Sequence, residues 1–181
     1  MIFTPLPLEG AWKVTLDQRE DSRGFFARVF CAREFGAHDL NTEWVQVNAS
    51  FSRAEGTLRG LHFQRPPMAE VKLVRCVSGA IYDVIVDLRA GSPTYGQWTG
   101  LELSAQNGAM IYIPRGFAHG FQTLRPDTEL LYFHSQYYSP AHEGGLHHAD
   151  PALGINWPRP VADLSPRDAG FAGLETLDPI P

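Results

Sequence analysis

Basic residues are scarce in this chain. Its 15 Lys and Arg are outnumbered by 20 Asp and Glu, which gives a formal net charge of −5 at pH 7. General binding to nucleic acid or to anionic membranes requires a large excess of positive charge. The composition therefore argues against both kinds of partner and predicts that any bound phosphate is met by a local cluster of bases.

Long apolar runs are missing as well. Nowhere do 18 apolar residues follow one another, and Met1 to Val14 contains no basic segment leading into an apolar one. Either feature would be expected of a membrane span or a secretory signal. We therefore expect no membrane association and a cytoplasmic location.

Cysteine is limited to Cys31 and Cys76. Two cysteines so far apart cannot form a CxxC redox or zinc motif, and a disulfide would be expected only in an exported protein. The sequence predicts that both are buried, reduced and inert.

Helical periodicity is also scarce, whereas short apolar or alternating runs separated by Gly, Pro, Asn and Asp are frequent. This pattern is typical of an all-β domain. So many strands in one domain of 181 residues require a barrel or a two-sheet jelly roll to protect their edges. The expected strands are 12–16, 25–30, 44–50, 58–63, 71–77, 80–88, 98–103, 110–113, 120–123 and 130–137.

Short sequence patterns predict turns, a helix and the faces of one strand. Asn107-Gly108 and Ser78-Gly79 are predicted hairpin turns, because their residues tolerate positive φ. A short helix is expected from Ser165, with Ser as N-cap, Pro166 in the first turn and Asp168 three residues on. Along 80–88, alternation places Asp83 and Asp87 on the same face as Ile81 and Ile85. Any space that this face of the strand lines is therefore expected to contain acidic side chains.

Two segments combine histidine, arginine and glycine within apolar surroundings: RGLHFQ at 59–64 and IPRGFAHGF at 113–121. Residues 108–119 read G-x5-P-x-G-x2-H, which resembles the second cupin motif. The matching first motif offers His62-Phe63-Gln64 in place of a histidine pair, and glutamine is a weak metal donor. We therefore predict no metal, although a metal-dependent cupin stays open as an alternative.

Lys72 is the other notable residue. It lies in the mostly apolar segment 71–77 and shares strand parity with Val74 and Cys76, where a lysine is costly unless it is paired or used. A position at the rim of the sheet is the alternative. For the histidines outside the two motifs, a core or surface role is expected; they are His38, His134, His142, His147 and His148.

Together these strings resemble the dTDP-4-dehydrorhamnose 3,5-epimerase family, from about Gly10 to Asp168. The resemblance is carried by DSRGFFARVF (21–30), QVNASFS (46–52), GTLRGLHFQ (56–64), KLVRCVSGAIYDVIVDLRAGSPTYGQW (72–98), IPRGFAHGFQTL (113–124), LLYFHSQYYSP (130–140) and DPALGINWP (150–158). Several ordered matches along one chain make this resemblance highly specific.

The resemblance implies a cupin-type jelly-roll barrel, or double-stranded β-helix, with a few short helices that are mainly C-terminal. It implies a single domain with a core at about 10–158, and a segment 159–181 that contributes to the site. A homodimer without metal or organic cofactor is expected. The implied reaction inverts C3 and C5 of a nucleotide-linked 4-keto-6-deoxyhexose, as in the conversion of dTDP-4-dehydro-6-deoxy-D-glucose to dTDP-4-dehydro-L-rhamnose.

The resemblance also implies residue roles. His62 matches the general base, Asp168 the acid that orients it, and Tyr132 the proton donor on the opposite face. Lys72 matches the cation beside the carbonyl oxygen. Residues at binding positions are Arg23, Phe26, Arg28, Gln46, Asn48, Arg59, His119 and Tyr138.

Arg28 departs from the family pattern, because members that use thymidine nucleotides commonly have glutamate there. Arginine cannot accept a hydrogen bond from the ring N–H of thymine. The nucleotide therefore stays open, with a CDP-linked sugar as an alternative, and so does the choice between a 3,5-epimerase and a single-centre epimerase or ketoisomerase. A non-catalytic sugar-binding module is the alternative from another class.

Overall fold

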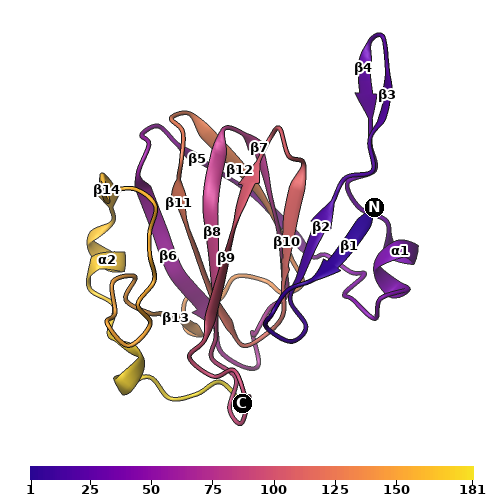
Figure 1. Ribbon diagram of the computed structural model, residues 1–181. Helices are drawn as coiled ribbons and strands as arrows, with labels where there is room; N and C mark the ends of the chain where they lie inside the picture. The colour runs from indigo at the N-terminus through magenta and orange to yellow at the C-terminus, as the bar shows by residue number, and fades with distance from the viewer.

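Two six-stranded sheets face each other in the computed structural model, which describes residues 1–181 (Figure 1). In spatial order, the first sheet contains β1 (Ile2–Pro5), β2 (Trp12–Thr15), β10 (Ala109–Ile113), β7 (Lys72–Ser78), β12 (Thr128–His134) and β5 (Gln46–Ser52). The second contains β13 (Glu143–Gly145), β6 (Thr57–Gln64), β11 (Phe117–Thr123), β8 (Ala80–Asp87) and β9 (Trp98–Ser104), with β14 (Asp163–Leu164) paired to β6.

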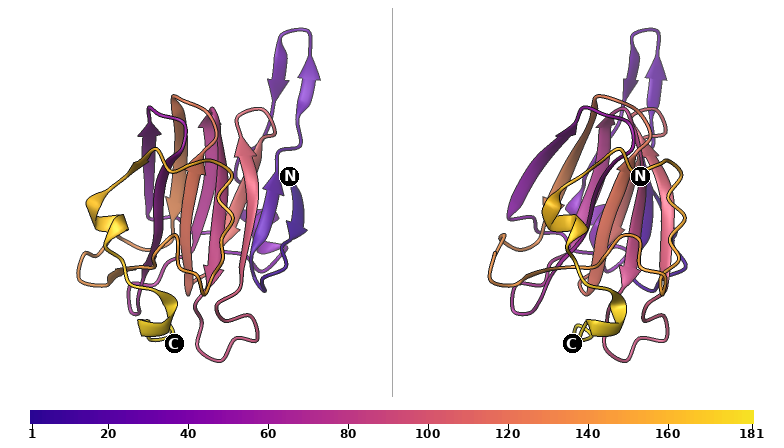
Figure 2. Two further views of the ribbon diagram at one scale, coloured as in Figure 1. Left: turned by 60° about the vertical axis from the view of Figure 1, so that its left-hand side comes forward. Right: turned by 90° about the vertical axis from the view of Figure 1, so that its left-hand side faces the viewer.

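The remaining elements lie outside the two sheets. Strands β3 (Arg19–Asp21) and β4 (Gly24–Phe26) form a separate hairpin that projects away from the sheets (Figures 1 and 2). The short helices are α1 (Ala32–Gly36), α2 (Pro166–Ala169) and the 3-10 turn η1 (Leu174–Thr176).

Strands that follow one another in the chain often lie in different sheets, which is the jelly-roll arrangement expected from the sequence. β7 and β8 belong to opposite sheets, and so do β9 and β10. The turns at Ser78-Gly79 and Asn107-Gly108 therefore pass between sheets, and their prediction as hairpins was wrong. Leu103 and Ala109, on either side of the second turn, pack into the same core between the sheets, which explains the crossing.

The main core lies between the sheets, and side-chain alternation separates it from two outer layers. In β8, Ile81 and Ile85 enter the central cluster, whereas Val84 and Val86 pack outward under the C-terminal segment. A third cluster lies under the N-terminal strands and α1. Asp83 is fully buried on the inner face, as its parity predicted.

Most predicted strands are present within a few residues of their expected ends. The strand expected at 25–30 ends at Phe26, and the one expected at 130–137 ends at His134. Five elements were not predicted from the sequence: β1, β3, β13, β14 and α1. The predicted helix begins as expected: Ser165 is the N-cap, and its Oγ accepts a hydrogen bond from the Asp168 N–H at 3.0 Å.

Neither cysteine forms a disulfide. Cys76 is buried, and burial raises the pKa of its thiol to about 11, which disfavours the reactive thiolate. Cys31 is partly exposed just before α1, so its predicted burial was wrong. None of the helices has the length and apolar character needed to cross a membrane.

Candidate active site

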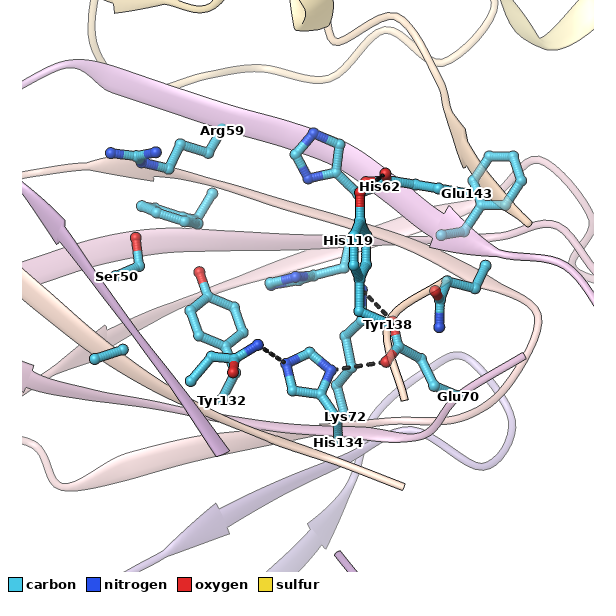
Figure 3. Close-up of a pocket in the computed structure, with 15 residues that line it drawn as sticks. Ser50, Arg59, His62, Glu70, Lys72, His119, Tyr132, His134, Tyr138 and Glu143 are labelled. Atoms are coloured by element: carbon cyan, nitrogen blue, oxygen red, sulfur yellow. Dashed lines mark hydrogen bonds and ion pairs between the residues drawn. The ribbon is translucent and has the colours of Figure 1, made fainter. Parts of the chain in front are cut away.

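A cavity of about 270 Å³ is lined by residues of both sheets. Figure 3 shows His62 and Arg59 along one wall, with Tyr132, His134 and Lys72 along the other. Several residues chosen from the sequence line this one space: Asn48, Arg59, His62, Lys72, His119, Tyr132 and Tyr138.

An irregularity in the β6–β11 pairing brings two of these side chains to the same wall. Arg59 and His62 are three residues apart, and in a regular strand they would face opposite sides of the sheet. The register shifts between His119 and Phe121 on the partner strand, so both residues line the cavity. Gly60 makes this close approach feasible: its φ is +126°, and an added Cβ would lie 2.5 Å from the Gly120 Cα.

His62 is paired with the carboxylate of Asp168 from α2. The His62 Nε2 atom lies 2.8 Å from Asp168 Oδ1, while Asp168 Oδ2 accepts a hydrogen bond from the Gly60 N–H at 3.0 Å. Burial lowers the pKa of His62 below its usual value, and Asp168 only partly opposes this shift. The imidazole is therefore neutral at pH 7 and able to accept a proton.

The Asp168 carboxylate remains charged. Burial alone would raise its pKa, but hydrogen bonds from His62 and the Gly60 amide more than offset that effect and hold the pKa below its usual value. Because Nε2 of His62 faces this carboxylate, we assign the ring proton to Nε2, which leaves Nδ1 as the basic nitrogen.

A second histidine–carboxylate pair lies deeper in the barrel. His119 Nε2 is 2.8 Å from Asp83 Oδ2, and both side chains are buried. Burial raises the pKa of Asp83, and His119 offsets part of the shift. The other carboxylate oxygen of Asp83 has no hydrogen-bond partner.

The facing wall supplies a cation and a phenol. Lys72 is buried on the inner face of β7, which rules out the rim alternative, and its Nζ lies 3.3 Å from Glu70 Oε1. Burial, with a smaller contribution from the charge of Asp83, raises the pKa of Tyr132 far above its usual value. Its hydroxyl therefore remains protonated at neutral pH and is available as a donor.

Two residues of this wall were not among those predicted from the sequence. His134, expected to be structural, lines the cavity, and its Nδ1 lies 2.7 Å from Glu70 Oε2. Strand parity was the available signal, because His134 is two residues from Tyr132 on β12 and faces the same side. Glu70 likewise shares parity with Lys72, although it precedes the strand.

Four other predicted binding residues do not line the cavity. Gln46 reaches it indirectly, through a hydrogen bond from its Nε2 to Asn48 Oδ1 at 3.1 Å. Arg23 and Phe26 belong to the projecting hairpin, where the Arg23 side chain is 87% exposed and Phe26 is 74% exposed. Arg28 forms an ion pair with Glu34 at 2.7 Å.

The residues that match cupin metal-ligand positions have protein partners here. His62 and His119 each direct Nε2 to a carboxylate. Gln64 donates to the Met68 carbonyl at 2.9 Å and accepts from the Ser139 N–H at 2.6 Å. The structure contains no cluster of three or more His, Cys, Asp and Glu side chains arranged to hold a metal ion.

Taken together, the geometry places a neutral base on one wall and a protonated acid and an ammonium group on the other. A ring bound between the walls would face a proton acceptor on one side and a proton donor on the other. Such an arrangement is suited to inverting a carbon that carries an acidic C–H bond.

Comparisons with known proteins agree with this chemistry. A family model described as dTDP-4-dehydrorhamnose 3,5-epimerase matches residues 5–176. A dTDP-4-dehydrorhamnose 3,5-epimerase from Sinorhizobium fredii is 52% identical over 155 residues, covering 85% of this chain and 80% of the relative. A dTDP-4-dehydrorhamnose 3-epimerase from Streptomyces niveus is 42% identical over 169 residues, covering 93% and 81% of the two chains.

A solved structure gives the same result. The dTDP-6-deoxy-D-glucose-3,5-epimerase of Legionella pneumophila, in complex with dTDP-4-keto-L-rhamnose, superposes with a TM-score of 0.91 at 38% identity, covering 98% of this chain and 94% of the other. With the family match spanning nearly the whole sequence and the same fold in a related enzyme, this chain belongs to the dTDP-4-dehydrorhamnose 3,5-epimerase family.

Proposed function

We propose that this protein inverts C3 and C5 of dTDP-4-dehydro-6-deoxy-D-glucose to give dTDP-4-dehydro-L-rhamnose. One observation carries the proposal: the His62–Asp168 pair and Tyr132 lie on opposite walls of a single cavity. The Legionella relative, in complex with dTDP-4-keto-L-rhamnose, supports the same class of sugar nucleotide.

His62 removes the proton in the first half of the reaction. The hydrogens on C3 and C5 flank the C4 ketone, so loss of either one produces an enolate. Nδ1 of His62 accepts the proton, and the Asp168 carboxylate stabilises the imidazolium that forms while keeping the ring oriented.

Lys72 stabilises the intermediate. The negative charge of the enolate resides on the C4 oxygen, and a fixed ammonium group beside that oxygen acts as an oxyanion hole does. Loss of one such donor typically lowers kcat by about 10²- to 10³-fold.

Tyr132 completes the inversion by donating its hydroxyl proton to the opposite face of the same carbon. The raised pKa of Tyr132 keeps this proton in place until a carbanion-like acceptor is present. Exchange with solvent then returns a proton to Tyr132 and removes one from His62, so the cycle balances and can be repeated at the second carbon.

Residues around the catalytic groups bind the nucleotide in this proposal. Arg59 and His119 serve the diphosphate, and the Arg59 guanidinium is held by hydrogen bonds to Ser52 Oγ at 3.2 Å and to the Phe51 carbonyl at 3.1 Å. Asn48 and Tyr138 contact the sugar and base near the cavity mouth. The C-terminal segment 159–181 is part of the same domain, to which it contributes Asp168.

A second copy of the chain completes the site. The β3–β4 hairpin carries Arg23 and Phe26 away from the cavity of its own protomer, and its exposed Phe25 and Phe26 are unusual for a free surface. In a homodimer, this hairpin would reach the cavity of the partner and add an arginine for phosphate. Arg28 would then accompany the hairpin toward the nucleotide.

Inversion of C3 alone is the second candidate, favoured by the 42% identity with the Streptomyces niveus 3-epimerase. Proton NMR of dTDP-4-keto-6-deoxyglucose incubated with the protein in D2O separates the two. Deuterium entering at C3 and C5 with inverted couplings is the expected result, and exchange at C3 alone would establish the single-centre enzyme. A folded protein that exchanges neither position would refute both.

A further inference from the structure

Glu70 lies between two nitrogen donors on the cavity wall. Its Oε1 is 3.3 Å from Lys72 Nζ, and its Oε2 is 2.7 Å from His134 Nδ1. The Glu70 side chain is only 8% exposed, and it is the one carboxylate within ion-pair distance of Lys72. Figure 3 shows the three side chains meeting at the end of the cavity away from Arg59.

The backbone fixes this meeting point. Lys72 on β7 and His134 on β12 are directly opposite each other in the antiparallel ladder. Beyond them, the Val71 N–H donates to Ser135 Oγ at 2.8 Å, and the Ser135 N–H donates to the Val71 carbonyl at 3.0 Å. Glu70, which precedes Val71, is thereby held over the side chains of Lys72 and His134.

The hydrogen bonds have a consistent direction. The ionised Glu70 side chain only accepts, so we assign a proton to His134 Nδ1; in this tautomer His134 Nε2 accepts from Asn48 Nδ2 at 3.4 Å. The Asn48 Oδ1 in turn accepts from Gln46 Nε2 at 3.1 Å. A single chain of contacts therefore connects Gln46, at the expected nucleotide end, to Lys72.

The charge of Glu70 persists in this setting. Burial alone would raise its pKa, but the hydrogen bond from His134 and the charge of Lys72 more than offset burial and hold the pKa below its usual value. A carboxylate offers an acceptor oxygen to each of the two donors, whereas an amide of the same shape offers only one.

We propose that Glu70 and His134 act as a positioning pair, which fixes the Lys72 ammonium at the place where the enolate oxygen develops and ties it to Asn48. The proposal rests on the proposed function, since it assigns these two residues to the same proton-transfer reaction. Neither residue transfers a proton to the sugar. They act through Lys72, and the enolate that Lys72 stabilises is common to both inversions.

This role predicts a particular kinetic pattern. A misplaced Lys72 weakens an interaction made mainly in the transition state, so kcat falls while KM changes little. Because C3 and C5 give enolates with the same oxygen, solvent exchange at both carbons falls by the same factor. Residues that orient a reactive group in this way typically contribute about 10- to 100-fold, by analogy with the partners that orient metal ligands.

Glu70→Gln is the direct test, with Glu129→Gln as its matched control. Glu129 lies at the other end of β12 and makes no ion pair. The two variants change the net charge equally, because each replaces a glutamate by glutamine. We expect Glu70→Gln to lower kcat about 10- to 100-fold with KM and dTDP affinity near wild type, and Glu129→Gln to retain wild-type rates. Thermal denaturation of each variant checks the fold.

His134→Phe supplies the second arm. Phenylalanine keeps the ring that stacks on Tyr132, at 6.0 Å and 17°, but removes both nitrogens. With no imidazole donor present, the single acceptor oxygen that remains after Glu70→Gln is free to serve Lys72. In the His134→Phe background, Glu70→Gln should therefore cost at least about threefold less than it does in the wild type, as coupled residues do in a double-mutant cycle.

The outcomes separate the two proposals. A wild-type protein that exchanges neither C3 nor C5 overturns the proposed function itself. With an active wild type, the positioning role is overturned by a Glu70→Gln kcat within twofold of wild type, by loss of exchange at one carbon only, or by costs that simply add in the double variant. A lower melting temperature with kcat and KM changed together would assign Glu70 to folding and also overturn it.

Discussion

His62 Nε2 lies 2.8 Å from Asp168 Oδ1, although 106 positions separate the two residues in the chain. The strand β6 carries His62 and the short helix α2 carries Asp168, so this contact depends on the docking of the C-terminal segment on the second sheet. Loss of that docking would leave the His62 ring without the carboxylate that contacts it, and the proposed mechanism without an oriented base.

Replacing the base should remove activity without loss of the fold. For His62→Ala we expect kcat to fall by about 10²- to 10⁴-fold, the usual contribution of a general base. The other basic side chains of that wall cannot replace it, because Arg59 is a charged guanidinium and His119 directs its Nε2 to Asp83. The measurement is the appearance of inverted product by NMR. His147→Ala, in a loop outside the cavity, is the control, and near-normal turnover by His62→Ala would contradict the assigned base.

The rate should depend on pH through His62. The base acts when neutral, and burial places its pKa below the ordinary value of 6.5, so kcat/KM should rise with pH along a limb centred below 6.5. Asp168 raises that pKa, hence Asp168→Asn should move the limb to still lower pH while lowering the plateau. A limb that stays in place, or moves to higher pH, would show that Asp168 does not act on the base.

Tyr132→Phe should uncouple exchange from inversion. His62 can still remove a proton and return a deuteron to the same face, but the opposite face has lost its donor. NMR in D2O should then show deuterium at C3 and C5 with the original couplings. Tyr137→Phe, an exposed tyrosine three residues after β12, should behave as wild type. Inverted product from Tyr132→Phe at wild-type rate would assign the proton donor to another residue.

The hairpin can be tested by mixing two inactive variants. If Arg23 serves the cavity of a partner subunit, a dimer formed from one Arg23→Ala chain and one His62→Ala chain holds one site with both defects and one intact site. Refolding the two together should recover at most about a quarter of wild-type activity, because half of the dimers are mixed and each has one working site. No recovery from a mixture shown to contain mixed dimers would place Arg23 in its own protomer.

Much of the barrel could be predicted because its strands alternate in a simple way. β8 is an example: Ile81 and Ile85 on one face and Val84 and Val86 on the other are enough to indicate two buried sides. The two turns could not be assigned correctly. Positive φ at Gly79 and Gly108 indicates a tight turn, but it does not tell whether the strand after the turn pairs with the strand before it or enters the other sheet.

The structure brings together those predicted residues that fall into motifs, whereas their roles remain predictions. His62, Lys72 and Tyr132 do line one cavity, and Asp168 contacts His62. Glu70 and His134 were not predicted to line the cavity, because they come together only where β12 pairs with β7, which is a property of register. The β3–β4 hairpin, which carries Arg23 and Phe26, projects away from the sheets after β2. No local sequence pattern indicates this direction.

Asp168 also has a bearing on how the protein matures. During synthesis, both cavity walls, from β5 to β12, leave the ribosome before α2 does. A chain that stops short of Ser165 carries His62 but lacks the carboxylate that orients its ring. In the proposed mechanism, the oriented base therefore exists only after the C-terminal segment has been synthesised and has docked on the second sheet.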